Sequence, residues 1–419
     1  MRREIVATIQ ESRPYGTLSL TAAERPAFWA TFLGWALDGM DYMIYTLVLP
    51  ALLVTFKLTT VQGGVLGSTT LLVSALGGII AGTVSDRIGR VRTLAAAVVV
   101  YSVFTALSGL ATSYSTLLVF RALEGLGFGG EWAVGAVLVA ETVRNSERGR
   151  VLGYMQSAWA IGWGIAEIVA LIVLPIAGAM GWRILFWIGI LPAFLAFYIL
   201  RRVPEPAVWV KKADTARQGL SFWKIFRPGL LRRTVFAALL AAGADSGYYA
   251  IFTWLPTYLK ADRHLSVVGS GSYLLLVILG SFVGYVVSGY IADWLGRKAT
   301  FVIYAVLSAV VILAYTHFNI SNGAMLGLSF PLGFFASGIF SGFGSFLAEL
   351  FPTEVRGAGQ GFTYNVGRGV SALAPLIVGA LATTYGLAGG ISIFAPLVYL
   401  VCLVSLLFLP ETKRLGLAE

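Results

Sequence analysis

Long apolar segments alternate with short polar segments along the whole chain. Each apolar segment holds about twenty residues or more, enough for a helix to cross a hydrocarbon core of roughly 30 Å. A membrane β-barrel would instead show segments of about ten residues that alternate in polarity. The pattern therefore predicts an all-α membrane protein. We expect twelve transmembrane spans, at residues 27–55, 61–84, 91–111, 115–141, 150–176, 183–201, 233–259, 267–292, 299–317, 323–349, 358–383 and 390–409.

The composition supports the same class. Of the 419 residues, 58% are hydrophobic and 12% are charged, whereas a soluble domain has about a quarter of its residues charged. Cys402 is the only cysteine in the sequence, so neither an intrachain disulfide nor a thiolate metal cluster is expected, and no cofactor is predicted. The segment before the first span contains acids and a proline and does not resemble a cleavable signal peptide.

The net charge of +10 comes from basic residues concentrated in alternate loops. The opposite set of loops contains only Lys57, Arg183, Lys260 and Arg263. This asymmetry follows the positive-inside rule and predicts that both termini and the loop at 202–232 are cytoplasmic. We therefore expect a multi-pass protein of the plasma (cell inner) membrane, embedded in the lipid bilayer and without a nucleic-acid partner.

The chain contains an internal repeat. The sequence GTVSDRIGR at 82–90 returns as GYIADWLGR at 289–297, with Gly, Asp, Gly and Arg at the same spacing. At a similar offset, Asp38 in the first span matches Asp245 in the seventh. Two parallel halves related by a pseudo-two-fold axis along the membrane normal are a plan of secondary transporters. The predicted organisation is a cytoplasmic tail at 1–26, a six-helix bundle at 27–201, a cytoplasmic linker at 202–232, a second six-helix bundle at 233–409 and a cytoplasmic tail at 410–419.

These motifs, together with ELFPTEVRG at 349–357 and PETK at 410–413, resemble those of major facilitator superfamily transporters over essentially the whole chain. Within that superfamily, GWALDGMD at 34–41 and YNVGRG at 364–369 resemble the sialate and lactate:proton symporters. The resemblance implies two pseudo-symmetric six-helix bundles that rock about a central site.

The Asp-x-x-Gly-Arg segments are expected to gate the cytoplasmic side. Asp86 and Asp293 lie at the inner ends of the second and eighth spans, where each can accept hydrogen bonds from a facing helix N-terminus or from an arginine. The resemblance implies that such pairs hold the cytoplasmic side closed in the outward-open state. The predicted gating residues are Gly82, Asp86, Arg87, Gly89, Arg90, Arg148, Asp293, Gly296, Arg297, Glu349 and Arg356.

Ionisable residues inside the spans mark a substrate or proton pathway, because a charge at the bilayer centre costs at least about 2.5–3.5 kcal/mol. The alternative for each is an ion pair or hydrogen bond that only holds helices together. Arg121 and Glu124, three residues apart, share a helix face and are expected largely to neutralise each other. The ionisable residues in the predicted spans include Asp38, Asp41, Arg121, Glu124, Glu131, Glu167, Asp245 and Arg368.

Arg368 is the predicted substrate anchor. It lies near the middle of the eleventh span, in a Gly-rich segment with no acid nearby in sequence. A guanidinium stays protonated at physiological pH and binds a carboxylate through two hydrogen bonds, which suits an anionic substrate. The alternative is a permanent ion pair with Asp245, Asp38 or Glu131. The other predicted substrate contacts are Asn365, Tyr364, Gln156 and Tyr249.

Proton coupling is predicted at the acids of the spans. Asp38 and Asp41 are three residues apart and share a helix face. Two like charges held close in a low dielectric cannot both stay ionised, so one should hold a proton in the working pH range. Asp245 and Glu131 are the other candidates, and the sequence does not choose among the four.

The sequence thus predicts a monomeric, proton-coupled symporter of a small organic anion, either a monocarboxylate or an acidic sugar, that works by alternating access and is not an enzyme. A sugar facilitator is the nearest alternative, but the seventh span lacks the paired glutamines of sugar porters. A drug:proton antiporter would carry a Gly-Pro motif in the fifth span, which is absent. A non-transporting nutrient sensor with a carrier fold is the alternative from another class. The breaks in the repeat, where Arg368 aligns with Ala160 and Glu131 with Ile339, are the predicted cargo site.

Overall fold

The structure, a computed structural model, describes residues 20–206, 210, 222–318, 320–352 and 355–413, with the side chains of 140, 145–150, 152, 153, 222 and 357 outside that description. Every element in these ranges is a helix, which confirms the predicted all-α class. The first half contains α1 (Arg25–Thr55), α2 (Thr60–Ile88), α3 (Arg90–Ser108), α4 (Tyr114–Thr142), α5 (Asn145–Ala177), η1 (Gly178–Met180), α6 (Gly181–Ile188) and α7 (Ala193–Arg202). The second half contains η2 (Phe222–Phe226), α9 (Pro228–Phe252), α10 (Leu255–Ala261), α11 (Val267–Leu295), α12 (Arg297–Thr316), α13 (Asn322–Gly338), η3 (Ile339–Gly342), α14 (Phe343–Leu350), α15 (Arg356–Ser371) and α16 (Ala374–Leu407).

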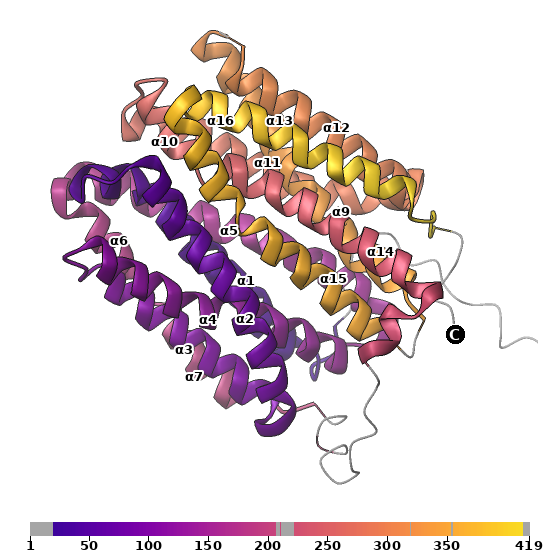
Figure 1. Ribbon diagram of the computed structural model, residues 1–419. Coiled ribbons are helices and arrows are strands. Elements are labelled where there is room, and N and C mark those ends of the chain that lie inside the picture. Colours follow the sequence, from indigo (N-terminus) through magenta and orange to yellow (C-terminus); the bar gives the residue numbers. More distant parts are fainter. Residues whose placement is uncertain (1–19, 207–209, 211–221, 319, 353–354, 414–419) are drawn as a thin grey trace, which may run out of the picture.

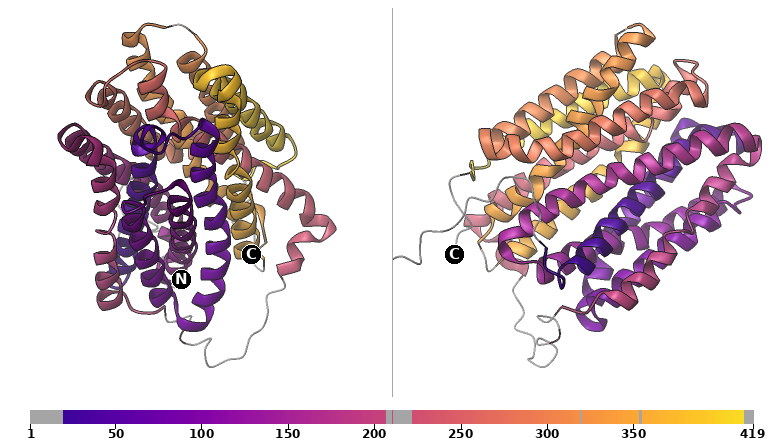
Figure 2. Two further views of the ribbon diagram at one scale, coloured as in Figure 1. Left: turned by 60° about the vertical axis from the view of Figure 1, so that its left-hand side comes forward. Right: turned by 180° about the vertical axis from the view of Figure 1, so that it is seen from behind.

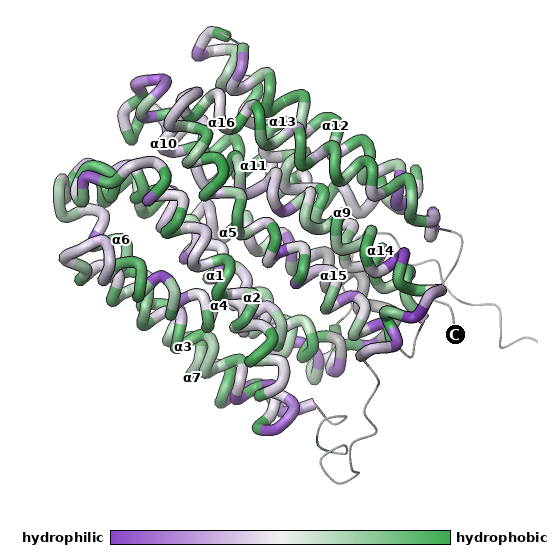
Figure 3. The backbone as a smooth tube through the Cα atoms, in the orientation of Figure 1, coloured by the Kyte–Doolittle hydropathy of each residue, from purple (hydrophilic) through white to green (hydrophobic). Residues whose placement is uncertain are grey.

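The helices provide the predicted number of membrane crossings. Ten stretches of the described chain are long and apolar enough to cross a membrane. Two of them, Tyr154–Arg202 and Ala358–Leu407, have 49 and 50 residues, and each is long enough for two crossings. Apolar residues dominate the middle of the helices, and polar residues gather at their ends (Figure 3).

Four predicted spans, at 183–201, 233–259, 323–349 and 358–383, are not continuous helices. Pro192 directly precedes α7, and Pro256 and Pro375 are the second residues of α10 and α16. Proline lacks a backbone N–H and cannot continue a preceding helix, so each of these breaks has a local cause. In the third of the four spans the short 3-10 helix η3 separates α13 from α14.

The last two crossings depart from the predicted pattern in a different way. The interval predicted between the spans ending at 383 and beginning at 390 is part of α16, which bends there. The bend is at Gly386, whose φ of 72° is a conformation that glycine adopts readily.

The two halves form separate bundles that lie side by side (Figure 1). We call the side that holds the α2–α3 junction and the C-terminus the inner side, and the side that holds α6 and α10 the outer side (Figure 1). Four helices that begin on the outer side start with a Ser or Thr whose side chain accepts a backbone N–H of the first turn, which satisfies a donor that the helix leaves open. These caps are Thr59, Ser113, Ser266 and Ser321.

The halves are in close contact at their outer ends. The Thr60 hydroxyl of α2 donates to the Gly379 carbonyl of α16 over 2.8 Å, and Ser68 Oγ accepts from the Leu376 amide over 3.1 Å. A Cβ added at Gly64 would lie 2.5 Å from the Pro375 carbonyl oxygen, so the backbones touch there. The outer side is therefore closed between α2 and α16.

Toward the inner side the halves separate between α5 and α11, while α15 stays in contact with α2. The helix α5 lies at the boundary with the second half and contacts α11 (Figure 2, right). From Ile161 of α5 and Phe282 of α11 inward, a groove of about 580 Å³ separates them, lined further by Phe28, Trp29 and Phe32 of α1. The outer side is thus closed between α2 and α16, and a groove opens toward the inner side between α5 and α11.

Candidate functional site

Four ionisable residues from four helices meet in the middle of the membrane region, and we call them the central site. They are Asp38 of α1, Glu131 of α4, Asp245 of α9 and Arg368 of α15, each no more than 4% exposed. Arg368 lies within electrostatic range of all three acids, and the carboxyl groups of Asp38 and Glu131 lie beside each other. The first half thus supplies two acids, and the second half one acid and the arginine.

The polar groups of the central site are largely without partners. Among the described residues, no hydrogen-bond partner reaches Nε or Nη2 of Arg368, either oxygen of Asp38 or Glu131, or Oδ2 of Asp245. The permanent ion pair that was the alternative prediction for Arg368 is absent from the described part of the chain. A buried polar group without a partner costs about 1–3 kcal/mol, and more when it is charged. Such groups mark the place of a ligand, a proton or water.

A connected set of aromatic rings begins beside Arg368. The Arg368 guanidinium lies 4.6 Å from the centroid of the Phe128 ring, a cation–π contact. Tyr42 lies nearly parallel to Phe128 with centroids 6.0 Å apart, and its ring meets Tyr249 of the other half at 5.3 Å. Flat apolar faces beside a fixed cation suit a planar anion. The rings of this aromatic wall are Trp35, Tyr42, Phe128, Trp132, Trp159, Tyr248, Tyr249, Phe340 and Tyr364.

The predicted substrate contacts differ in where they lie. Tyr249 is in the aromatic wall and in electrostatic range of Arg368. Tyr364 packs its ring 6.0 Å from Trp132 of the first half. Asn365 faces α2 instead, because its Nδ2 donates to the Gly361 carbonyl of its own helix over 2.8 Å and its Oδ1 lies near Gly78. Gln156 is buried, and its Oε1 has no hydrogen-bond partner among the described residues.

A second buried cluster lies within the first half and consists of Asp41, Arg121 and Glu124. Arg121 and Glu124 form a buried ion pair, which confirms that they neutralise each other. The Arg121 guanidinium also lies 4.5 Å from the Tyr45 ring and within electrostatic range of Asp41. Asp38 and Asp41, expected to act on each other, therefore have different main partners. Asp38 belongs to the central site and Asp41 to this first-half cluster.

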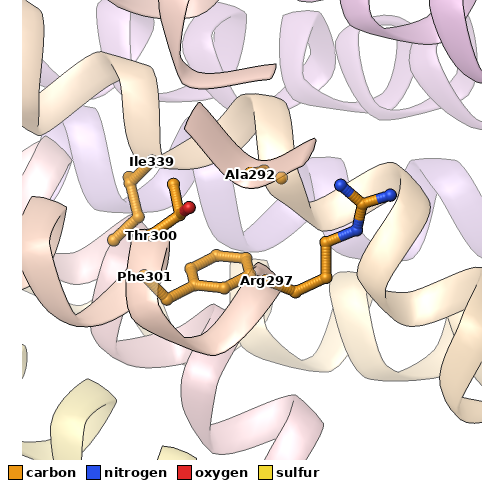
Figure 4. Close-up of a pocket in the computed structure, with 6 residues that line it drawn as sticks. Ala292, Arg297, Thr300, Phe301 and Ile339 are labelled. Atoms are coloured by element: carbon orange, nitrogen blue, oxygen red, sulfur yellow. The ribbon is translucent and has the colours of Figure 1, made fainter. Parts of the chain in front are cut away.

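Two ion-pair clusters occupy the inner face, one in each half, and we call them the inner-face clusters. In the first, Arg90 reaches Asp86 at 2.5 Å and Glu141 at 3.1 Å. In the second, Arg297 reaches Asp293 at 2.6 Å and Glu349 at 3.3 Å. The Arg297 guanidinium points away from the apolar residues Phe301 and Ile339 (Figure 4). Both predicted motifs thus fold into the same constellation.

The inner-face clusters rest on a tight junction between helices. Gly89 and Gly296 join α2 to α3 and α11 to α12 with φ of 110° and 106°, values that disfavour any side chain. Two acids cap the helices that begin there: Glu205 accepts from the backbone of Arg90 over 2.8 Å, and Glu411 accepts from that of Arg297 over 3.0 Å. Sequence analysis missed this capping, although the repeated Pro-Glu pairs at 204–205 and 410–411 were its signal.

Glu411 is held in its ionised form. Burial opposes ionisation, but the backbone N–H groups of Lys413, Arg297 and Lys298 donate to the carboxylate and lower its pKa below the usual value. An acid that stays ionised complements the partial positive charge of the α12 N-terminus.

The remaining predicted gating residues lie apart from the Arg90 and Arg297 ion pairs. Gly82 has open space where a Cβ would lie, and Arg87 is exposed. Arg356 Nε donates to the Ala348 carbonyl over 3.0 Å. The side chain of Arg148 lies outside the described residues, so its expected pairing with the Asp86 segment stays a prediction.

An ion pair that sequence analysis missed joins the start of α1 to the α4–α5 junction. Arg144 Nε and backbone N each donate to Glu24 Oε1 over 2.9 Å. Burial would raise the pKa of Glu24, but hydrogen bonds from Thr21 and Arg144 outweigh it and lower that pKa to about 2. No cluster of three or more His, Cys, Asp or Glu residues able to hold a metal ion occurs in the part of the chain that the structure describes.

The chain is similar to known transporters over nearly its whole length. A family model described as Major Facilitator Superfamily matches residues 31–367 and 275–418. A protein of Cupriavidus pinatubonensis named as a probable 4-methylmuconolactone transporter is 38% identical, over 94% of this chain and 92% of its own. The cis,cis-muconate transport protein of Acinetobacter baylyi is 31% identical, over 92% and 94%. The sialic acid transporter of Escherichia coli is 29% identical, over 92% and 93%.

The fold also has a counterpart among solved structures. A crystal structure of a bacterial homologue of the human lysosomal transporter Spinster, in an inward-facing and unoccupied conformation, superposes with a TM-score of 0.68 at 18% identity. The match covers 93% of this chain and 95% of that one.

Proposed function

Because the chain belongs to the Major Facilitator Superfamily of transporters, we propose that it carries a small organic anion across the membrane together with a proton. The concentration of basic residues in alternate loops supports an inner-membrane location with both termini in the cytoplasm. Three of its relatives are named for the transport of a muconolactone, a muconate and sialic acid, which supports an organic acid as the substrate.

The unpartnered Nε–Nη2 edge of the Arg368 guanidinium carries this proposal. Its Nε and Nη2 form the edge that binds a carboxylate through two parallel hydrogen bonds, and both atoms are buried without a partner among the described residues. The aromatic wall would then cover the body of the substrate. Flat rings favour a planar, unsaturated carboxylate over a saturated monocarboxylate or an acidic sugar, since ring stacking needs a flat partner.

Electrostatics links the anion to a proton. An anion on Arg368 brings negative charge close to Asp38 and Glu131, and it also occupies the cation that stabilises their ionised forms. Both effects favour protonation of one of these acids. Linkage is reciprocal, so the proton raises affinity for the anion by the same factor. The site that holds both the anion and the proton carries less net charge than the site that holds only one of them. Symport follows if the two halves rock only in the less charged state.

The same arrangement supports alternating access. The outer ends of α2 and α16 are in contact, while the inner parts of α5 and α11 are separated by the groove. In our proposal the inner ends close when the outer ends part, and the segments that carry Asp86 and Asp293 then meet the opposite half. The inner-face clusters keep those segments rigid for that contact.

Uptake into proteoliposomes driven by an imposed pH gradient, acidic outside, tests the proposal. We expect cis,cis-muconate and benzoate to compete with the labelled substrate better than lactate, pyruvate, sialate or a neutral sugar. Solute counterflow without a gradient would distinguish a carrier from a non-transporting sensor. Uptake that ignores the pH gradient would contradict proton coupling while leaving transport itself intact.

Substitution of Arg368 tests the anchor. Arg368→Lys keeps the charge but loses the planar fork, so we expect uptake to fall by about tenfold or more, and Arg368→Ala to abolish it. Arg232→Lys is the matched control, because Arg232 also stacks on a ring, Phe408 at 5.5 Å, but lies outside the site. Undiminished uptake by Arg368→Ala would overturn the role.

A further inference from the structure

A buried acid outside the central site lies on the surface where the two halves meet. The surface is the outer part of the α5–α11 contact. A Cβ added at Gly164 would lie 3.5 Å from Ile278, and one added at Gly271 would lie 2.5 Å from Leu171. From the first contact to the second, the residue number rises by seven on α5 and falls by seven on α11, as expected for antiparallel helices. Glu167 lies between them on α5.

Glu167 faces the other half. It follows Gly164 by three residues and precedes Leu171 by four, a spacing that places all three on one face of the helix. One turn earlier on α5, the Trp163 ring packs 5.0 Å from Phe252 of α9, which is also in the second half. The apolar residues level with Glu167 on α11 are Leu274 and Leu275.

The side chain of Glu167 is buried, and one of its carboxyl oxygens has no partner in the described part of the chain. The residue is 2% exposed, and its Oε2 has no hydrogen-bond partner among the described residues. Burial opposes ionisation of this carboxyl group. The helices α1, α4, α6, α11 and α14 pack against α5, and α9 reaches it through Phe252. Their titratable and charged groups are Arg25, Asp38, Asp41, Tyr42 and Tyr45 of α1, Tyr114, Arg121, Glu124, Glu131 and Glu141 of α4, Arg183 of α6, Arg232, Arg233, Asp245, Tyr248 and Tyr249 of α9, Tyr273, Tyr285, Tyr290 and Asp293 of α11, and Glu349 of α14.

A lone carboxylate in an apolar interface is strongly disfavoured, because nothing replaces the water that it loses. The group therefore holds a proton while α5 and α11 are packed together. When the halves part on the outer side, the same face of α5 meets water and the carboxyl group can ionise. Closing the interface again requires the proton to return.

We infer that Glu167 is a second proton-binding site, separate from the central acids, whose proton must be bound before the outer side can close. The proton binds the carboxylate from the outer solution and returns to the outer solution when the interface opens. It therefore is not carried across the membrane. It makes closure of the outer side, and with it the inward-open state, more favourable in acid, whatever anion the protein transports.

Cysteine labelling from the outer side tests this inference without any substrate. The native Cys402 is buried and is replaced by serine. A reporter cysteine in Leu171→Cys lies in the interface, and a control cysteine in Ile176→Cys, on the same helix, replaces a residue that is 82% exposed. A membrane-impermeant maleimide is applied to right-side-out vesicles between pH 6 and pH 9, and the ratio of reporter to control labelling cancels the pH dependence of the reagent.

With Glu167 present, we expect the labelling ratio to rise by about fivefold or more from pH 6 to pH 9, as the open population grows. In Glu167→Gln the ratio should stay at its low, acidic value, because the amide is neutral at every pH. Glu167→Leu provides a second neutral side chain in case the amide disturbs folding, and its labelling ratio should also stay at the low, acidic value at every pH.

Several results would overturn the inference. One is a ratio that rises equally in Glu167→Gln and the parent, and another is a ratio that does not change with pH in the parent. A third is loss of the pH response in Asp38→Asn, which would assign closure to the central acids. Because no substrate is present, failure here is distinct from failure of the anion proposal.

Discussion

The inner-face clusters and the central site contain the same kinds of residue, but the arginines form ion pairs in the clusters and none in the central site. On the inner face, Arg90 and Arg297 each bridge two acids, at 2.5 and 3.1 Å in the first half and at 2.6 and 3.3 Å in the second. In the central site Arg368 has three acids within electrostatic range and forms an ion pair with none of them. The inner-face clusters are satisfied in both halves, whereas the central site contains one repeated pair, Asp38 and Asp245, and two residues present in one half only, Arg368 and Glu131. We propose that this site is left open for a ligand and a proton.

The difference shows what duplication preserves. A satisfied network works equally well in both halves, so both copies can persist. A binding site for one anion needs one arginine, and a second at Ala160 would add an uncompensated charge to the bilayer centre, which costs at least about 2.5 kcal/mol. In our proposal, the residues that differ between the halves are therefore the ones that bind the anion and the proton.

The sharpest contrast comes from the same substitution in both regions. Glu131→Gln in the central site should remove pH-driven accumulation, by about a hundredfold, because a neutral amide cannot exchange the coupled proton. Counterflow should survive in this variant. Glu141→Gln on the inner face is the matched control and should slow uptake while keeping its pH dependence. Equal loss of pH dependence in both variants would contradict the distinction between the central site and the inner-face clusters.

The repeat itself can be tested by parallel substitutions. Arg90→Lys and Arg297→Lys should each reduce the uptake rate by roughly tenfold, since a lysine cannot bridge two acids as a guanidinium fork does. We expect the two effects to agree within about a factor of three, because the distances match. Uptake rates of both variants at saturating substrate provide the comparison. A large effect in one half alone would show that the clusters are not equivalent.

The capping acids should matter for stability more than for transport. Glu205→Gln and Glu411→Gln each weaken charge-assisted hydrogen bonds to a helix N-terminus, which should cost about 1 kcal/mol of unfolding free energy. Thermal unfolding in detergent measures the change, and the double variant should show the sum. Unchanged melting with reduced uptake would instead assign these residues to gating.

The smallest effect concerns Glu24. Because its pKa in the folded protein is about 2 and the ordinary value is 4.5, its ionised form stabilises the fold. That contribution is complete above pH 4.5 and disappears as the pH falls toward 2. Glu24→Gln should therefore melt at a lower temperature than the parent at pH 7, and the gap should narrow as the pH is lowered below 4.5. A gap that is constant with pH would assign the effect to packing.

Much of the fold was readable from the sequence because the signals are local or repeated. Hydropathy located the crossings, and the Asp-x-x-Gly-Arg repeat located the two halves. The breaks before α7, α10 and α16 were missed because a single proline lowers the mean hydropathy of an apolar run too little to interrupt it. The residues of the central site were predictable individually, since burial of Asp38, Glu131 or Arg368 in a span is unusual.

Their grouping was not predictable. Residues three apart on a helix are about 60° apart around its axis, which is enough for different neighbours to separate them. Asp38 meets Glu131, whereas Asp41 lies near Arg121. Arg121 and Glu131 are separated by about 15 Å of helical rise along α4. The contact of Phe128 with Arg368 joins two halves of the protein and has no local signal.

Proton uptake on binding tests the central claim most directly. Purified protein in weakly buffered solution near neutral pH is mixed with cis,cis-muconate, and a pH indicator records protons taken up while tryptophan fluorescence records binding. We predict net proton uptake in step with binding, both lost in Arg368→Ala, with binding kept but proton uptake lost when Asp38→Asn and Glu131→Gln are combined. Binding without proton uptake in the unaltered protein, or tight binding to Arg368→Ala, would contradict the account.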